Sequence, residues 1–110
     1  MAFTENYYDR RGKAIDRLAF YRLHANMAYK RIASDVLTDG TWLSTVWLGR
    51  DHAFPDDTQP VIFETMVFKS QDNLEDLDMQ RYVTEEQAQA GHRALVAKYQ
   101  KLLEPMEGRT

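Results

Sequence analysis

The chain has 110 residues, of which 44% are apolar, carries a net charge of −3 and contains no cysteine. This length fits one modest core, so we expect residues 1–110 to form a single domain with a frayed tail over about residues 104–110. The lack of cysteine excludes disulfides and thiolate chemistry. No window approaches the roughly 18 apolar residues of a membrane helix, which predicts a cytoplasmic protein with no membrane partner.

Charge is distributed unevenly along the chain. Residues 1–50 carry eight basic and five acidic side chains, whereas residues 51–86 carry two basic and ten acidic ones. The acidic stretch repels nucleic acid and favours a basic protein surface, although solvated acidic loops are also common without any partner. The best nucleic-acid candidate is Arg10-Arg11 with Lys13, which we interpret as a solvated turn, so a nucleic-acid partner is not expected.

The N-terminal part is expected to contain a short helix. Residues 6–12 have the composition of a turn or a short strand. Apolar side chains then recur at helical spacing, which predicts an amphipathic helix of about ten residues that ends near His24. The apolar positions of this helix are Ile15, Leu18, Ala19, Tyr21 and Leu23.

Two hairpins are predicted in the middle of the chain. Asp39-Gly40 separates residues 32–38 from residues 42–48, and this dipeptide readily adopts the positive φ angles of a two-residue hairpin turn. A looser hairpin joins the second strand to a third at residues 61–68. Its loop, residues 49–60, contains prolines and an acidic pair that do not fit inside a ladder of strands.

A fourth strand and a long helix complete the predicted fold. Apolar and polar residues alternate over residues 76–83, which predicts the strand. The segment from Thr84 to Gln87 has the form of a capping box, so a helix is expected to begin there and to run to about Leu103. The order of elements predicts an α+β fold, in which an antiparallel sheet of three to four strands packs against an N-terminal and a C-terminal helix.

A belt of polar side chains crosses the predicted sheet. With a two-residue turn, Ser34 would face Thr45, and with a symmetric second loop Thr45 would face Glu64. The same registers place Asp35, Ser44 and Thr65 in a second row on the opposite face. The belt would thus have one row beneath the helices and one row away from them.

Glu64 is the carboxylate that we expect to be perturbed, because a carboxylate under a helix layer must be hydrogen-bonded or protonated. Two interpretations of the belt stay open. It could be a satisfied hydrogen-bond network that fixes strand register. Alternatively, Glu64 or Asp35 could act as an acid or base at the floor of a pocket.

Few residues offer other chemistry. His52 with Asp51, or His92 with Glu64, could form a carboxylate-oriented imidazole site, but the spacing matches no metal motif, so neither a metal nor a cofactor is expected. His92 lies on the apolar stripe of its helix, and we interpret it as a hydrogen-bonded core residue. Ser44 has no glycine elbow and no base beside it in the sequence, so we assign no catalytic residue.

Two strings carry a family resemblance. They are residues 42–52 (WLSTVWLGRDH) and residues 62–68 (IFETMVF), and residues 7–12 and 84–92 add similarity at the two ends. Together they resemble a family of small uncharacterised (hypothetical) proteins of tailed bacteriophages, especially actinobacteriophages. The resemblance implies a phage or prophage origin, expression in the host cytoplasm and no assigned activity, and no catalytic residue follows from it.

Our leading hypothesis is a small phage-type cytoplasmic protein that binds a host or phage macromolecule, in one form inhibiting a host process, without catalysis of its own. One alternative is a small enzyme or ligand-binding protein that uses Glu64 with His52 or His92. Another is a homodimeric scaffold that pairs through an open sheet edge or an aromatic face. Binding is expected in the acidic loops at residues 51–59 and 70–78, and the candidate contact residues are Asp51, His52, Phe54, Asp56, Asp57, Asp76 and Asp78.

Overall fold

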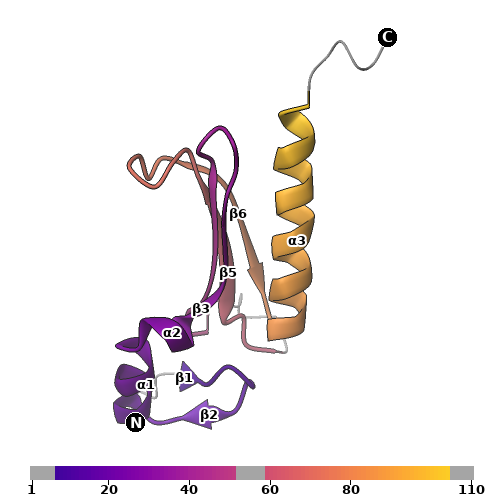
Figure 1. Cartoon of the computed structure of the whole chain (residues 1–110). Coiled ribbons are helices and arrows are strands. Elements are labelled where there is room, and N and C mark those ends of the chain that lie inside the picture. The colour runs from indigo at the N-terminus through magenta and orange to yellow at the C-terminus, as the bar shows by residue number, and fades with distance from the viewer. Residues whose placement is uncertain (1–6, 52–58, 105–110) are drawn as a thin grey trace.

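The computed structural model describes residues 7–51 and 59–104, and it places a four-stranded antiparallel sheet beside one long helix (Figure 1). The strand order is β3-β4-β5-β6, and a separate small sheet pairs β1 with β2. The predicted α+β class is confirmed, while residues 105–110 of the expected tail lie outside the described residues. The elements are β1 (Tyr7–Tyr8), β2 (Ala14–Ile15), α1 (Arg17–His24), α2 (Met27–Lys30), β3 (Arg31–Val36), β4 (Trp42–Trp47), β5 (Phe63–Phe68), β6 (Asp76–Tyr82) and α3 (Glu85–Leu102).

The helix α3 begins where the capping box predicts and covers one face of the sheet. The Thr84 hydroxyl oxygen accepts from the Gln87 backbone N–H at 3.1 Å, and Gln87 Oε1 accepts from the Thr84 backbone N–H at 3.4 Å. These bonds satisfy amide groups at the start of the helix that have no partner within it. The side chains that α3 buries against the strands are Ala88, His92 and Leu95.

The turn between β3 and β4 has three residues, so the predicted two-residue turn is wrong. The Leu37 N–H donates to the Thr41 carbonyl at 2.8 Å, and the Gly40 N–H donates to the Leu37 carbonyl at 2.9 Å. Gly40 has a φ of +95°, as expected for the glycine bulge that closes such a turn. The extra residue moves the register by one position, and the Cα partners are Val36–Trp42, Asp35–Leu43, Ser34–Ser44 and Ala33–Thr45.

The pairing of β4 with β5 also differs from the prediction by one residue. The predicted hairpin is present, but Thr45 faces Thr65, and Glu64 faces Val46 instead. A symmetric loop over residues 49–60 would pair Leu48 with Val61. Instead, the Leu48 N–H donates to the Ile62 carbonyl at 2.7 Å, so the pairing is shifted by one residue. Side chains alternate along a strand, so this shift changes the face on which each residue lies.

The predicted fourth strand is confirmed as β6, which pairs with β5. Three polar residues of this strand, Asp78, Gln80 and Tyr82, unexpectedly face α3. Asp78 lies opposite the buried Val67, and Tyr82 lies opposite the buried Phe63. The apolar Met79 therefore lies on the face of the sheet opposite α3.

The N-terminal segment packs at one end of the sheet. The helix α1 has eight residues rather than about ten, because the Asp16 side chain caps it by accepting from the Ala19 N–H. It ends at His24 as expected. The Trp47 ring anchors this region, with its centroid 5.7 Å from that of Phe20 and 5.0 Å from that of Tyr29.

Gly49 allows the aromatic rings to approach the backbone at this end of the sheet. It has a φ of +78°, and a Cβ atom there would lie 2.6 Å from ring atoms of both Phe20 and Trp47. The two rings can pack this close to the backbone only because residue 49 has no side chain. Gly49 is thus required both by its backbone conformation and by the packing of its neighbours.

We predict that Gly49→Ala destabilises the protein by roughly 2–5 kcal/mol, because a positive φ costs about 1–2 kcal/mol and overpacking about 1–3 kcal/mol. Gly12→Ala is the matched control, since Gly12 has a φ of +82° but no atom within 4 Å of a Cβ. It should lose only about 1–2 kcal/mol. Urea unfolding measures both losses, and equal losses would contradict the packing argument.

Candidate functional site

A continuous chain of hydrogen bonds runs through the layer between the sheet and α3. Asp35 Oδ2 lies 2.7 Å from His92 Nε2, and His92 Nδ1 lies 2.7 Å from Thr45 Oγ1. Thr45 Oγ1 lies 2.5 Å from Thr65 Oγ1, which accepts from the Tyr82 hydroxyl at 3.0 Å. Each strand of the sheet thus contributes one residue, and α3 contributes the imidazole. We call these five residues the buried polar chain.

The hydrogens of the buried polar chain can all point the same way. An ionised carboxylate only accepts, so His92 donates from Nε2 to Asp35 and accepts at Nδ1 from the Thr45 hydroxyl. Thr65 then donates to Thr45, and Tyr82 donates to Thr65. Within the described residues, no buried side-chain nitrogen or oxygen lacks a partner. A network satisfied in this way holds strand register and helix position together.

The buried polar chain has the order of a catalytic triad, carboxylate to imidazole to hydroxyl. Its burial argues against that chemistry. Thr45 and Thr65 are 0% exposed and His92 is 3% exposed, whereas the Asp35 side chain at the outer end is 53% exposed. A nucleophile must border a cavity that admits substrate, and the Thr45 hydroxyl has no such access. The buried polar chain therefore stabilises the fold, and His92 is a hydrogen-bonded core residue as predicted.

Gly91 brings the last member of the buried polar chain into place. A Cβ atom at this position of α3 would overlap the Tyr82 ring and its hydroxyl oxygen. The Tyr82 ring therefore packs directly on the helix backbone. Burial raises the pKa of Tyr82, which keeps its hydroxyl protonated as the donor to Thr65.

The predicted polar belt is present, but its two rows are composed differently. Asp35, Thr45 and Thr65 face α3, whereas Ser34, Ser44 and Glu64 lie on the opposite face. The expectation that Glu64 lies beneath a helix is wrong, because both registers are shifted by one residue. Glu64 Oε2 instead accepts from Arg81 Nε at 2.9 Å, and Ser34 Oγ accepts from Trp42 Nε1 at 2.9 Å.

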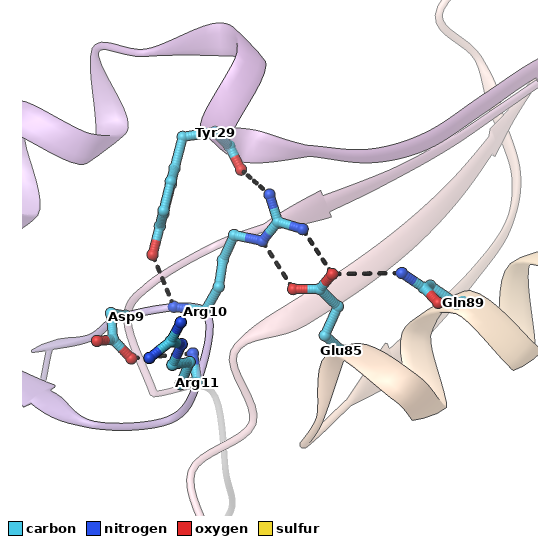
Figure 2. Close-up of polar contacts among 6 residues, drawn as sticks. All are labelled: Asp9, Arg10, Arg11, Tyr29, Glu85 and Gln89. Atoms are coloured by element: carbon cyan, nitrogen blue, oxygen red, sulfur yellow. Dashed lines mark hydrogen bonds and ion pairs between the residues drawn. The ribbon is translucent and has the colours of Figure 1, made fainter.

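A groove of about 600 Å³, lined by both charged and apolar residues, lies between the turn after β1 and the start of α3. Figure 2 shows the contacts of Arg10 in this groove. Its Nε and Nη2 atoms donate to the two Glu85 carboxylate oxygens at 2.7 and 2.5 Å. Arg10 also donates from Nη1 to the Tyr29 carbonyl at 3.0 Å and from its backbone N–H to the Tyr29 hydroxyl at 2.8 Å. This arginine joins the N-terminal segment to α2 and α3.

The charges of this groove are balanced within the chain. The hydrogen bonds from Arg10 lower the pKa of Glu85, and Glu85 raises the pKa of Arg10. Gln89 Nε2 also donates to Glu85 at 3.3 Å. The other two charged residues of the lining, Arg11 and Glu86, have opposite signs. The charged groups of the groove therefore hold the N-terminal segment to α3, and they do not form a site for a charged ligand.

The face of the sheet opposite α3 carries six apolar side chains together with polar ones. Val36 and Met79 are 52% and 45% exposed there, so no described element covers them. The Trp42 and Phe68 rings lie side by side, with centroids 5.2 Å apart. We call this surface the open face, and define it by Val36, Trp42, Val46, Met66, Phe68 and Met79.

Two of the predicted contact residues, Asp51 and Asp78, are engaged within the chain. Asp51 accepts from the Val61 N–H at 2.9 Å and so closes the base of the long loop. Asp78 accepts from Lys98 Nζ and the Tyr99 hydroxyl, both at 3.1 Å, and the bond from Lys98 lowers its pKa. Asp76 is exposed at the start of β6. The remaining candidates, His52, Phe54, Asp56 and Asp57, lie outside the described residues.

No protein-family model, no curated protein and no solved structure matches this chain. Over residues 7–51 and 59–104, no three His, Asp or Glu side chains are grouped to hold a metal ion. No helix in this part of the chain is both long and apolar enough to cross a membrane. Among the surfaces of the described residues, the open face is the clearest candidate for a functional site.

Thr45→Val tests the buried polar chain, because valine keeps the shape of threonine but leaves His92 Nδ1 without a donor. We expect a loss of about 1–3 kcal/mol in unfolding free energy. Thr65→Val should lose a similar amount, and the double variant less than the sum, because the two hydroxyls depend on each other. Ser44→Ala on the open face is the control and should stay within about 0.5 kcal/mol of the wild type. Additive losses in urea unfolding would contradict a coupled network.

Glu85→Gln tests the tie to Arg10 through its pH dependence. The folded-state pKa of Glu85 is lowered, so its contribution to stability is present above the unfolded pKa and is lost as the pH falls through the lower folded value. We expect the variant to be about 0.5–1 kcal/mol less stable than the wild type at neutral pH. The difference should shrink as the pH falls below about 4. Glu86→Gln is the control, and a pH-independent difference for Glu85→Gln would exclude the ion pair as the cause.

Proposed function

We propose that this chain is a small protein-binding protein without catalysis of its own, and that the open face is its docking surface. The observation that carries this proposal is the exposure of Val36 and Met79 beside the Trp42–Phe68 ring pair. The proposed partner is a protein that presents an apolar patch with Lys and Arg along one border. A basic border on the partner would complement the acidic turn at one end of the open face.

The size and composition of the open face support this proposal. Four strands about 4.8 Å apart and six or seven residues long, at about 3.3 Å per residue, make a footprint of roughly 400 Å². Exposed apolar patches of a few hundred Å² on small proteins are often binding sites. Aromatic residues and Met are enriched in the centres of protein interfaces, and the open face contains Trp42, Phe68, Met66 and Met79.

The acidic turn between β5 and β6 supports the choice of partner. Residues 70–76 contain three exposed carboxylates, Asp72, Glu75 and Asp76, and no Lys or Arg. Leu74 in the same turn is 60% exposed. This arrangement favours a basic protein surface and disfavours nucleic acid, because phosphates would be repelled. The acidic loop expected at residues 70–78 thus retains a role, although Asp78 itself is engaged with α3.

The biological setting that we propose depends on the family resemblance alone. Residues 42–52 and 62–68 resemble small proteins of tailed bacteriophages, and on that basis we propose a phage-type protein acting in the host cytoplasm. Its partner would be a host or phage protein. Inhibition of a host process is one form that such binding could take.

The alternative of an enzyme or ligand-binding protein with a Glu64/His site has less support. Glu64 lies on the open face with Arg81, and His92 lies on the other face with Asp35 and Thr45. The sheet therefore separates the two groups that the alternative needs to bring together. His52, the other imidazole considered for this site, lies outside the described residues.

A photo-crosslinking amino acid placed at position 79 tests the docking surface. The same amino acid at Leu102, which is 69% exposed on α3, is the matched control. We expect a defined protein to crosslink from position 79 and not from position 102. With that protein purified, Met79→Lys should weaken binding roughly tenfold or more, because it places a charge within the apolar contact, and Leu102→Lys should not. Equal binding by both variants in calorimetry would contradict the proposal.

A further inference from the structure

We infer that the protein that occupies the open face is a second copy of this chain, stacked face to face with its strands antiparallel to those of the first. This inference rests on the proposed function, since it takes the open face as the docking surface and names its partner. A two-fold axis between the two sheets, perpendicular to the strands, relates the copies. Each copy then presents the same surface to the other, as a closed dimer requires.

The two ends of the sheet carry opposite charges. Residues 7–31, which include α1 and α2, contain seven Lys or Arg and two Asp. They lead into Arg31, whose partner Val46 lies beside Glu64 at one end of the ladder. The acidic turn at residues 70–76 follows Phe68, which pairs with Trp42 at the other end. The chain thus contains both the acidic border and the basic border that the open face needs in its partner.

Antiparallel stacking places these charges against each other. The two-fold axis brings the end of the sheet that carries α1 and α2 over the end of the other copy that carries the acidic turn, and this contact occurs twice. In the view of Figure 1, α3 lies on one side of the sheet, while α1 and the turn between β5 and β6 extend on the other side at its two ends. Stacking with parallel strands would instead bring basic ends together and acidic ends together, which like-charge repulsion disfavours.

The centre of the open face suits a sheet-to-sheet contact. Stacked sheets pack about 10 Å apart with interdigitating side chains. Ser44 leaves room near the middle of the face, and Met66 and Met79 are flexible enough to fill irregular gaps. Two of the charged groups on this face, Glu64 and Arg81, already pair with each other at 2.9 Å, so covering these two leaves neither charge unpaired.

The area of the open face sets the expected strength of the dimer. Its footprint of roughly 400 Å² is about half of the roughly 800 Å² per partner that stable complexes bury. The apolar contact alone is therefore small, and the charged ends must contribute to the association. The dimer should accordingly be weak and sensitive to salt, because added ions screen surface charges.

Analytical ultracentrifugation of the full chain over a range of concentrations tests this assembly. We expect a monomer–dimer equilibrium whose Kd rises about tenfold or more between roughly 0.05 and 0.5 M salt. Met79→Lys should abolish the dimer, and Leu102→Lys should leave its Kd within about twofold of the wild type. A chain that stays monomeric at all concentrations, or a dimer unaffected by Met79→Lys, would overturn the inference.

Charge exchange tests the antiparallel arrangement. One variant carries Arg17→Glu and Arg22→Glu on α1, and a second carries Asp72→Lys and Glu75→Lys in the acidic turn. Each variant alone should be monomeric, because it brings like charges together at both ends. An equimolar mixture should dimerise, since each acidic α1 then meets a basic turn and each basic α1 meets an acidic one. A chain with all four substitutions should also dimerise, and this rescue shows that the substituted chains fold.

Arg93→Glu with Lys101→Glu on α3 gives the same change in net charge as the α1 variant and should leave the dimer intact. Failure of the mixture, or of the chain with all four substitutions, to dimerise would overturn the antiparallel arrangement. The chain with all four substitutions pairs opposite charges with itself only when the strands are antiparallel, so it distinguishes the two arrangements. The inference and the proposed function fail separately. A monomeric wild type that crosslinks a different protein from position 79 would reject self-association and keep the docking surface, whereas a monomer that crosslinks nothing would reject both.

Discussion

The length of the turn between β3 and β4 decides which side chains meet α3. A two-residue turn would move every side chain of β3 to the other face, so that Ser34 and Val36 would lie beneath the helix and Asp35 would point away. His92 would then lose its carboxylate partner. The hydrogen bond from Leu37 to Thr41 and the positive φ of Gly40 prevent this. The same one-residue difference in the next hairpin places Thr65 under the helix in place of Glu64, which avoids burying a carboxylate.

The position of α3 and the register of the strands depend on each other through the buried polar chain. His92 bonds to β3 and β4 at once, and Thr45 passes the contact on through Thr65 to Tyr82. A shift of the helix or of one strand would leave a buried hydroxyl or ring nitrogen unpaired, at a cost of about 1–3 kcal/mol for each group. Apolar packing of α3 alone would not distinguish such shifts as sharply, because it has no direction.

Sequence patterns predicted the elements better than the contacts between them. The capping box at Thr84, the two hairpins and the four strands depend on residues within a few positions of one another, so local signals were sufficient. Asp-Gly fits a two-residue or a three-residue turn, which is why the register was wrong by one. The pairs His92–Asp35 and Arg10–Glu85 join residues 57 and 75 positions apart, and no local pattern indicates them. In β6, the polar side chains of Asp78 and Tyr82 can face α3 because they have hydrogen-bond partners there. Lys98 and Tyr99 bond to Asp78, and Thr65 bonds to Tyr82.

The distribution of polarity in β4 and β5 is what sets this sheet apart. An antiparallel sheet with one solvated face normally alternates apolar residues inward with polar residues outward. Here Thr45 and Thr65 lie at the centre of the covered face, whereas Trp42, Val46, Met66 and Phe68 lie on the open one. The polar residues inside are satisfied by particular partners, but the apolar residues outside gain only when water is excluded from them, by roughly 25 cal/mol for each Å². Strands of this composition are suited to a sheet that is covered on both faces. Within the described residues, α3 covers one face, and no element covers the other.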